Sequence, residues 1–118
     1  MNLNVEKILI IGLGMIGSSI ALASKSKGIK VFGFDKSNNS IKEALEKNII
    51  VSSLDSIDDI DSSEFVKEID LIVIAVPPKQ TLEVLKSLKN IWNTNITITD
   101  TSSVKNHIKL DDVTNIVL

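Results

Sequence analysis

The 118-residue chain contains no cysteine and no tyrosine, and it has one histidine and one tryptophan. Without cysteine, disulfide, thiol-redox and cysteine-based zinc chemistry are excluded. A single histidine cannot build a metal site by itself, so we expect no bound metal. Arginine is also absent: all thirteen basic residues are lysines, and the formal net charge is −2. Because the lysines form no basic stripe, we expect no nucleic-acid partner.

Long apolar runs are missing as well. The longest uninterrupted ones are far too short to span a bilayer, so we expect no membrane partner. Residues 1–7 lack the basic-then-apolar order of a signal peptide, and we therefore expect a cytoplasmic protein. A chain of 118 residues is about one domain's worth and can bury a core without disulfides or metal. We predict one domain spanning residues 1–118.

The apolar residues instead come in short continuous runs, which are typical of strands buried on both faces of a parallel sheet. Such runs predict strands at residues 7–11, 30–35, 49–51, 71–76, 96–100 and 116–118. Helical spacing and start and stop signals predict helices over residues 15–27, 40–47, 64–69, 78–91 and 103–109. This alternation predicts an α/β fold: a doubly wound parallel sheet of about six strands in the Rossmann order 3-2-1-4-5-6.

A glycine-rich turn joins the first predicted strand to the first predicted helix. Its sequence over residues 12–17 is GLGMIG, which matches the G-x-G-x-x-G fingerprint in its required context. The first glycine permits the tight turn, the second lets a pyrophosphate approach the backbone, and the third lets the helix pack closely on the sheet. The alternative is a tight turn with incidental glycines. We predict that a dinucleotide contacts Gly12, Leu13, Gly14, Met15, Ile16 and Gly17, near the helix N-terminus.

An acidic residue ends the second predicted strand. Asp35 lies where the fingerprint expects a carboxylate that bonds the adenine ribose hydroxyls; the alternative is an ordinary Asx turn or helix cap. A carboxylate there repels the 2′-phosphate of NADP, by roughly 4 kcal/mol at ~4 Å and an effective dielectric near 20. Lys36 offsets part of this repulsion. We therefore predict that both residues contact the cofactor and that the cofactor is NAD.

The crevice of this topology opens at the carboxyl ends of strands one and four. Ala75, Val76 and Pro77 lie there, and we predict that they pack beside the nicotinamide ribose and ring. The alternative is that the prolines simply end the strand and start a helix. Thr81 lies one turn into that helix and is a further cofactor candidate.

A polar turn, DTSSVK, covers residues 100–105 after the fifth predicted strand. Its hydroxyls are candidates for binding substrate or orienting the nicotinamide, Lys105 for adding a positive charge, and Asp100 for contacting the cofactor. The alternative is a helix N-cap, and the two roles are compatible. His107 lies in a polar segment and is expected to face solvent rather than to act as a base.

Four segments together resemble a known family. They are residues 10–21 (IIGLGMIGSSIA), 31–36 (VFGFDK), 70–77 (DLIVIAVP) and 99–105 (TDTSSVK). They resemble the N-terminal NAD-binding domain of the prephenate/arogenate dehydrogenase family, and the resemblance covers nearly the whole chain. The last motif discriminates most, because related β-hydroxyacid dehydrogenases carry a Ser-Thr pair there. Ser102 is a departure, since the family often has glycine at that position.

The resemblance implies an NAD-dependent oxidoreductase of tyrosine biosynthesis. The reaction is the oxidative decarboxylation of prephenate to 4-hydroxyphenylpyruvate, with hydride transfer to NAD. Ser103 would be a catalytic residue beside the substrate hydroxyl and the nicotinamide. The family's catalytic histidine and its helical, dimer-forming C-terminal domain are absent from this chain, and His107 does not correspond to that histidine. We therefore expect the 118 residues to bind NAD without turning over prephenate, within a longer homodimeric protein.

Other functions stay open on the sequence alone. Arogenate is the nearest rival substrate, and the residues that choose between the two substrates lie outside this sequence. A β-hydroxyacid-dehydrogenase-like oxidoreductase or a pyrroline-carboxylate reductase is more distant. A non-catalytic module that senses NAD or NADH is the alternative from another class of protein.

Overall fold

The computed structural model describes residues 5–57, 67–88 and 96–101. Their order along the chain is β1 (Lys7–Ile11), α1 (Met15–Ser26), β2 (Lys30–Phe34), α2 (Asn38–Glu46), β3 (Ser52–Ser53), β4 (Leu71–Ile74), α3 (Pro78–Ser87) and β5 (Thr97–Asp100). Within this part of the chain, no helix is both long and apolar enough to cross a membrane.

The strands form one parallel sheet in the order β3-β2-β1-β4-β5. Ile10 in the central strand β1 pairs with Gly33 of β2 on one side and with Val73 of β4 on the other. The predicted doubly wound parallel sheet is therefore confirmed for its first five strands. The sixth strand, predicted at residues 116–118, and the helix predicted at 103–109 lie outside the described residues, as do residues 64–66 of the helix predicted at 64–69.

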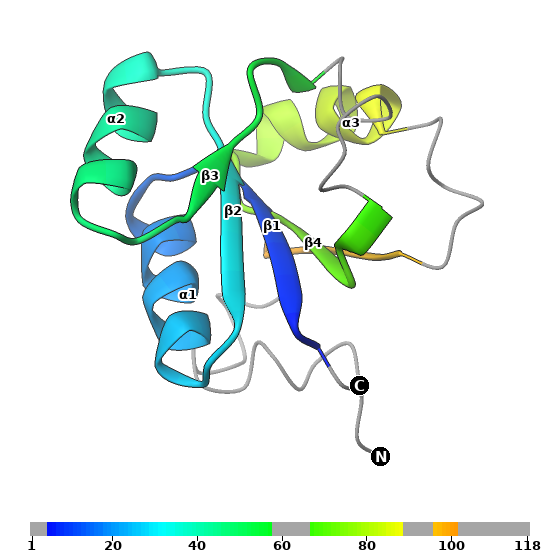
Figure 1. The fold of residues 1–118 in the computed structure, drawn as a ribbon. Helices are drawn as coiled ribbons and strands as arrows, with labels where there is room; N and C mark the ends of the chain where they lie inside the picture. Colours follow the sequence, from blue (N-terminus) through cyan, green and yellow to red (C-terminus); the bar gives the residue numbers. More distant parts are fainter. Residues whose placement is uncertain (1–4, 58–66, 89–95, 102–118) are drawn as a thin grey trace.

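Alternate residues of each strand feed two separate cores, as the twofold repeat of a strand requires. Ile8 and Ile10 pack with residues of α1 and α2 on one face of the sheet. Leu9 and Ile11 pack with residues of α3 on the other face. Figure 1 shows this layering, with α1 and α2 on one side of the strands and α3 on the other. Because both faces are covered, β1 is apolar from Ile8 to Ile11 and β4 is apolar throughout.

The third strand differs from the prediction of residues 49–51. The structure places β3 at Ser52–Ser53, paired with Phe32 and Gly33. The reason lies at the end of α2, where Asn48 has a left-handed φ of 58°. The backbone amides of Ile49 and Ile50 both donate to the carbonyl of Ala44, so this aliphatic pair completes the helix terminus instead of joining the sheet.

Candidate functional site

Gly12 forms a turn that is pressed against the end of β4. Its φ is +104°, and a Cβ there would lie 2.7 Å from the carbonyl carbon and oxygen of Ala75. Its backbone amide donates to the carbonyl of Phe34 at 2.8 Å. Both the backbone conformation and the close approach therefore require glycine at this position. The turn is fixed between the carboxyl ends of β2 and β4.

The other two glycines of the motif have opposite surroundings. A Cβ at Gly17 would lie 1.8 Å from the carbonyl oxygen of Gly12, so Gly17 is required for packing α1 against the turn. A Cβ at Gly14 would meet nothing within 4 Å. Gly14 is exposed and has an ordinary φ of −74°. The structure itself does not need glycine at position 14, and its open side is where a ligand can approach the backbone.

Gly14 is also the N-cap residue of α1. No side chain caps this helix end, and its first turn contains no acidic residue. Helix N-termini leave backbone N–H groups without intrahelical partners, and the helix dipole adds partial positive charge there. This end of α1 can therefore accept an anionic group such as a pyrophosphate.

Asp35 lies directly after β2, and its carboxylate accepts hydrogen bonds from two backbone segments. Its Oδ2 accepts a hydrogen bond from the amide of Leu13 at 2.7 Å, and its Oδ1 accepts one from the amide of Ser37 at 2.8 Å. The turn expected as the alternative role for Asp35 is thus present. Asp35 also lines a cavity, so it can contact a ligand while it holds the backbone in place.

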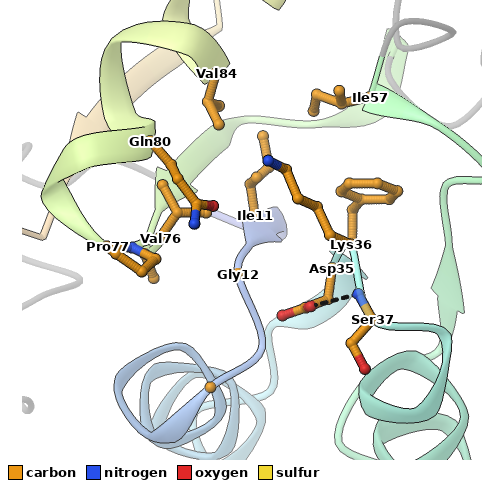
Figure 2. A pocket seen from close by; sticks show the side chains of 13 residues that line it. Ile11, Gly12, Asp35, Lys36, Ser37, Ile57, Val76, Pro77, Gln80 and Val84 are labelled. Carbon is orange, nitrogen blue, oxygen red and sulfur yellow. Dashed lines mark hydrogen bonds between the residues drawn. The ribbon is translucent and has the colours of Figure 1, made fainter.

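That first cavity has a volume of about 300 Å³ and opens at the carboxyl edge of the sheet. Figure 2 shows Asp35 and Ser37 on one side of it and Val76, Pro77 and Gln80 on the other. Apart from Asp35 and Lys36, its lining is uncharged and largely aliphatic. It is lined by Ile11, Gly12, Gly14, Phe34, Asp35, Lys36, Ser37, Ile57, Ala75, Val76, Pro77, Gln80 and Val84.

A second cavity of about 270 Å³ adjoins the first. The two share the lining residues Gly14, Ala75, Val76 and Pro77. Met15, Ile16, Pro78 and Thr101 complete the lining of the second. A dinucleotide has two nucleosides flanking a pyrophosphate, and two cavities that meet at an open glycine and a helix N-terminus offer one place for each of these three parts.

Most of the predicted cofactor residues come together around these cavities. The first is lined by Gly12, Gly14, Asp35, Lys36, Ala75, Val76 and Pro77, and the second also by Met15 and Ile16. Leu13 contributes its amide to Asp35 while its side chain is buried, and Gly17 is buried beneath the turn.

Like Leu13 and Gly17, the predicted residues Thr81 and Asp100 line neither cavity. Thr81 is in α3, and its hydroxyl is buried without a hydrogen-bond partner in the part of the chain that the structure describes. Asp100 ends β5, where it pairs with Ile74. Ser103, Lys105 and His107 lie outside the described residues.

Other lining residues did not follow from the sequence motifs. Gln80 and Val84 reach the first cavity from α3, where their spacing of four residues puts them on one face of the helix. That spacing does not specify what the face meets. Thr101 lines the second cavity beside the predicted Asp100; it is buried, and its amide donates to the carbonyl of Ile74 at 3.0 Å. Ser37 and Ile57 are brought to the first cavity by the loops after β2 and β3, which no local pattern specifies.

Among residues 5–57, 67–88 and 96–101, no three acidic, histidine or cysteine side chains gather in a way that could hold an ion.

A parallel sheet in this order, with cavities at its carboxyl edge, defines an α/β domain of the Rossmann type. Residues 20–117 match the family model for the nucleotide-binding domain of prephenate dehydrogenase. The chain belongs to this family, as its nucleotide-binding domain, and the resemblance noted in the sequence is confirmed. The match begins after the glycine turn, so the turn adds evidence that the family model does not supply.

Two curated prephenate dehydrogenases are similar to this chain in sequence. The chain is 36% identical over 106 residues to the prephenate dehydrogenase of Lactococcus lactis subsp. cremoris (strain MG1363), covering 87% of this chain and 28% of that protein. It is 36% identical over 111 residues to the prephenate dehydrogenase of Bacillus subtilis (strain 168), covering 92% of this chain and 29% of that protein. The chain thus spans less than a third of the length of these relatives.

Solved structures of similar shape include a prephenate dehydrogenase from A. aeolicus in complex with hydroxyphenyl propionate and NAD+. Its TM-score is 0.73 at 27% identity, covering 86% of this chain and 35% of that one. An arogenate dehydrogenase from Synechocystis has a TM-score of 0.71 at 20% identity, covering 90% of this chain and 36% of that one. The second likeness is one of fold alone.

Proposed function

We propose that this chain binds NAD across the two adjoining cavities and is the cofactor domain of a prephenate dehydrogenase. The observation that carries the proposal is the contrast among the three glycines. Gly12 and Gly17 are required by packing, whereas Gly14 is open, uncapped and shared by both cavities. Without a ligand, only the general preference of helix N-caps for small residues favours glycine at position 14, and serine, asparagine or aspartate would serve there equally well. A pyrophosphate seated on the first turn of α1 supplies a reason specific to glycine.

Each part of the lining has a role in holding the cofactor. The adenosine half occupies the first cavity, where Asp35 accepts hydrogen bonds from the ribose hydroxyls and the aliphatic walls cover the base. The nicotinamide half occupies the second cavity, where Met15, Ile16 and the end of β4 exclude water from the ring. We assign cofactor contacts to the predicted residues that line the cavities, and to Leu13 and Gly17 the support of the turn. The lining residues are Gly12, Gly14, Met15, Ile16, Asp35, Lys36, Ala75, Val76 and Pro77.

Bound NAD supplies the hydride acceptor for the oxidative decarboxylation of prephenate. The family resemblance supports Ser103 as the residue beside the substrate hydroxyl. The reaction also needs a proton acceptor and a substrate pocket. We assign these to parts of a longer, homodimeric, cytoplasmic protein in which residues 1–118 form the cofactor domain. Its partners are small molecules rather than nucleic acid or membrane.

Isothermal titration calorimetry of the 118-residue chain with NAD and with NADP tests the proposal. We expect NAD to bind and to bind more tightly than NADP, because Asp35 lines the cavity that takes the adenine ribose. Absence of NAD binding by the folded chain would overturn the proposal. The reading frame downstream of residue 118 separates the enzyme from a sensing module. The enzyme predicts a His-Pro motif followed by a helical domain, and the sensor predicts a domain of another kind.

A further inference from the structure

Two charged side chains line the first cavity, Asp35 and Lys36. Lys36 is the one cation in that lining, and the chain has no arginine to clamp a phosphate. The 2′-phosphate that distinguishes NADP from NAD requires a cation close to the adenine ribose. Whether the cavity accepts NADP therefore depends on where the Lys36 ammonium group is held.

The side chain of Lys36 extends from the end of β2 toward α3. Its Nζ lies 4.0 Å from Oε2 of Glu83 in α3. Figure 2 shows Lys36 extending from the end of β2 across the view toward α3. Glu83 directly precedes Val84 and lies three residues after Gln80, and both of these line the cavity. The ion pair thus spans the rim of the cavity, joining the loop after β2 to α3.

We propose that Glu83 is a specificity-determining residue that favours NAD by competing with a 2′-phosphate for Lys36. This inference rests on the proposed function. NAD presents hydroxyls at the adenine ribose, which Asp35 accepts without help from a cation. NADP presents a phosphate, which must draw Lys36 away from Glu83 to obtain a cation. Glu83 therefore weakens NADP binding and has little effect on NAD binding.

The size of the effect follows from exposure. The two side chains are 68% and 75% exposed, so water and salt screen the pair. We expect loss of the Glu83 charge to tighten NADP binding about fivefold at low ionic strength. The gain shrinks as salt is added. The same exposure means that substitution at either position leaves the fold intact.

Calorimetry of the 118-residue chain with NAD and NADP, at low and at high salt, tests this inference with the variant Glu83→Gln. We expect NADP to bind about fivefold more tightly at low salt and NAD affinity to stay within twofold. Glu43→Gln is the matched control. It makes the same chemical change in another exposed carboxylate–lysine pair, with Lys47, away from both cavities, and neither affinity should change.

A double variant separates competition for Lys36 from simple repulsion by Glu83. If Glu83 acts by holding Lys36, then Glu83→Gln has no effect on NADP affinity in a Lys36→Gln background. A fivefold gain that persists in that background overturns the inference, as does an unchanged ratio of NAD to NADP affinity in the single variant. Failure of the unmodified chain to bind NAD overturns the proposed function instead.

Discussion

The carboxylate of Asp35 accepts a hydrogen bond from the backbone amide of Leu13, 22 residues earlier in the chain, at 2.7 Å. The acid that the fingerprint assigns to ribose recognition is therefore also the group that fixes the glycine turn. A second bond, from the amide of Ser37, fixes the same carboxylate to the start of α2. The position of the turn and the charge of the ribose pocket are thus coupled through one side chain.

Asp35→Asn tests this coupling. Loss of one charged acceptor is expected to lower the free energy of unfolding by about 1–3 kcal/mol, because hydrogen bonds to a carboxylate are stronger than neutral ones. Loss of the negative charge is expected to narrow the preference for NAD over NADP. At about 4 Å the repulsion removed is about 1 kcal/mol in water and about 4 kcal/mol at an effective dielectric of 20. Urea unfolding and calorimetry measure the two effects.

Asp70 offers the matched control for Asp35. Its Oδ2 accepts hydrogen bonds from the amides of Glu6 and Lys7 at 2.8 and 3.0 Å, but it precedes β4 and so lies at the opposite edge of the sheet. Asp70→Asn is expected to reduce stability without changing the ratio of NAD to NADP affinity. An unchanged ratio in Asp35→Asn would contradict the specificity argument.

The strand order could be predicted because Ile8–Ile11 of β1 and all of β4 are buried on both faces and are apolar. The prediction of the third strand at residues 49–51 was wrong for a local reason. Ile49 and Ile50 have strand-like composition, yet the left-handed turn at Asn48 directs both amides to the carbonyl of Ala44. The aliphatic side chain of Ile50 predicts that the residue is buried, and it is. It does not specify which carbonyl accepts the hydrogen bond from the Ile50 amide.

The residues of the site likewise divide into those that the sequence predicts and those that it does not. Gly12, Gly14 and Asp35 could be predicted because each belongs to a short motif with a fixed spacing. Gln80 and Thr101 could not, because each reaches a cavity only through the packing of a helix or strand end against the glycine turn. The place of Thr81 one turn into α3 predicts a cofactor contact, yet Thr81 lines neither cavity.

Ile72→Ala tests the role of the central strands in stability. Ile72 is fully buried in β4 and belongs to the core beneath α3. We expect the substitution to lower the free energy of unfolding by about 2–5 kcal/mol, from lost burial and the cavity left behind. Urea unfolding measures it. Leu82→Ala is the control, since that side chain is 64% exposed, and a change above about 0.5 kcal/mol there would be unexpected.

The pKa of Glu43 is lowered by a hydrogen bond from Lys47 and by the positive charge of that side chain. Because the folded-state pKa is the lower one, the pair stabilises the fold above the ordinary glutamate pKa, and the effect is lost as pH falls through the folded value. We expect Glu43→Gln to lower the urea midpoint slightly at pH 7, by an amount that shrinks toward pH 3. In a Lys47→Gln background no such pH-dependent difference should remain.

Gly14→Val tests the assignment of the open glycine to ligand binding. Nothing lies within 4 Å of a Cβ at this position, and its φ of −74° suits any residue, so we expect the variant to fold, with a loss of about 1 kcal/mol or less because valine is a poorer N-cap than glycine. A side chain there covers the first turn of α1. We therefore expect NAD affinity to fall at least tenfold, about 1.4 kcal/mol or more. Thermal melting and calorimetry on the same sample separate the two properties.

Gly12→Ala is the informative counterpart, because the same motif predicts the opposite result. An alanine there must adopt a φ of +104° and place its Cβ 2.7 Å from the backbone of Ala75. We expect the free energy of unfolding to fall by about 1–3 kcal/mol or more from strain alone, in the absence of any ligand. If Gly14→Val instead destabilised the fold while leaving NAD affinity intact, glycine at position 14 would be structural, and the diphosphate would have to bind elsewhere.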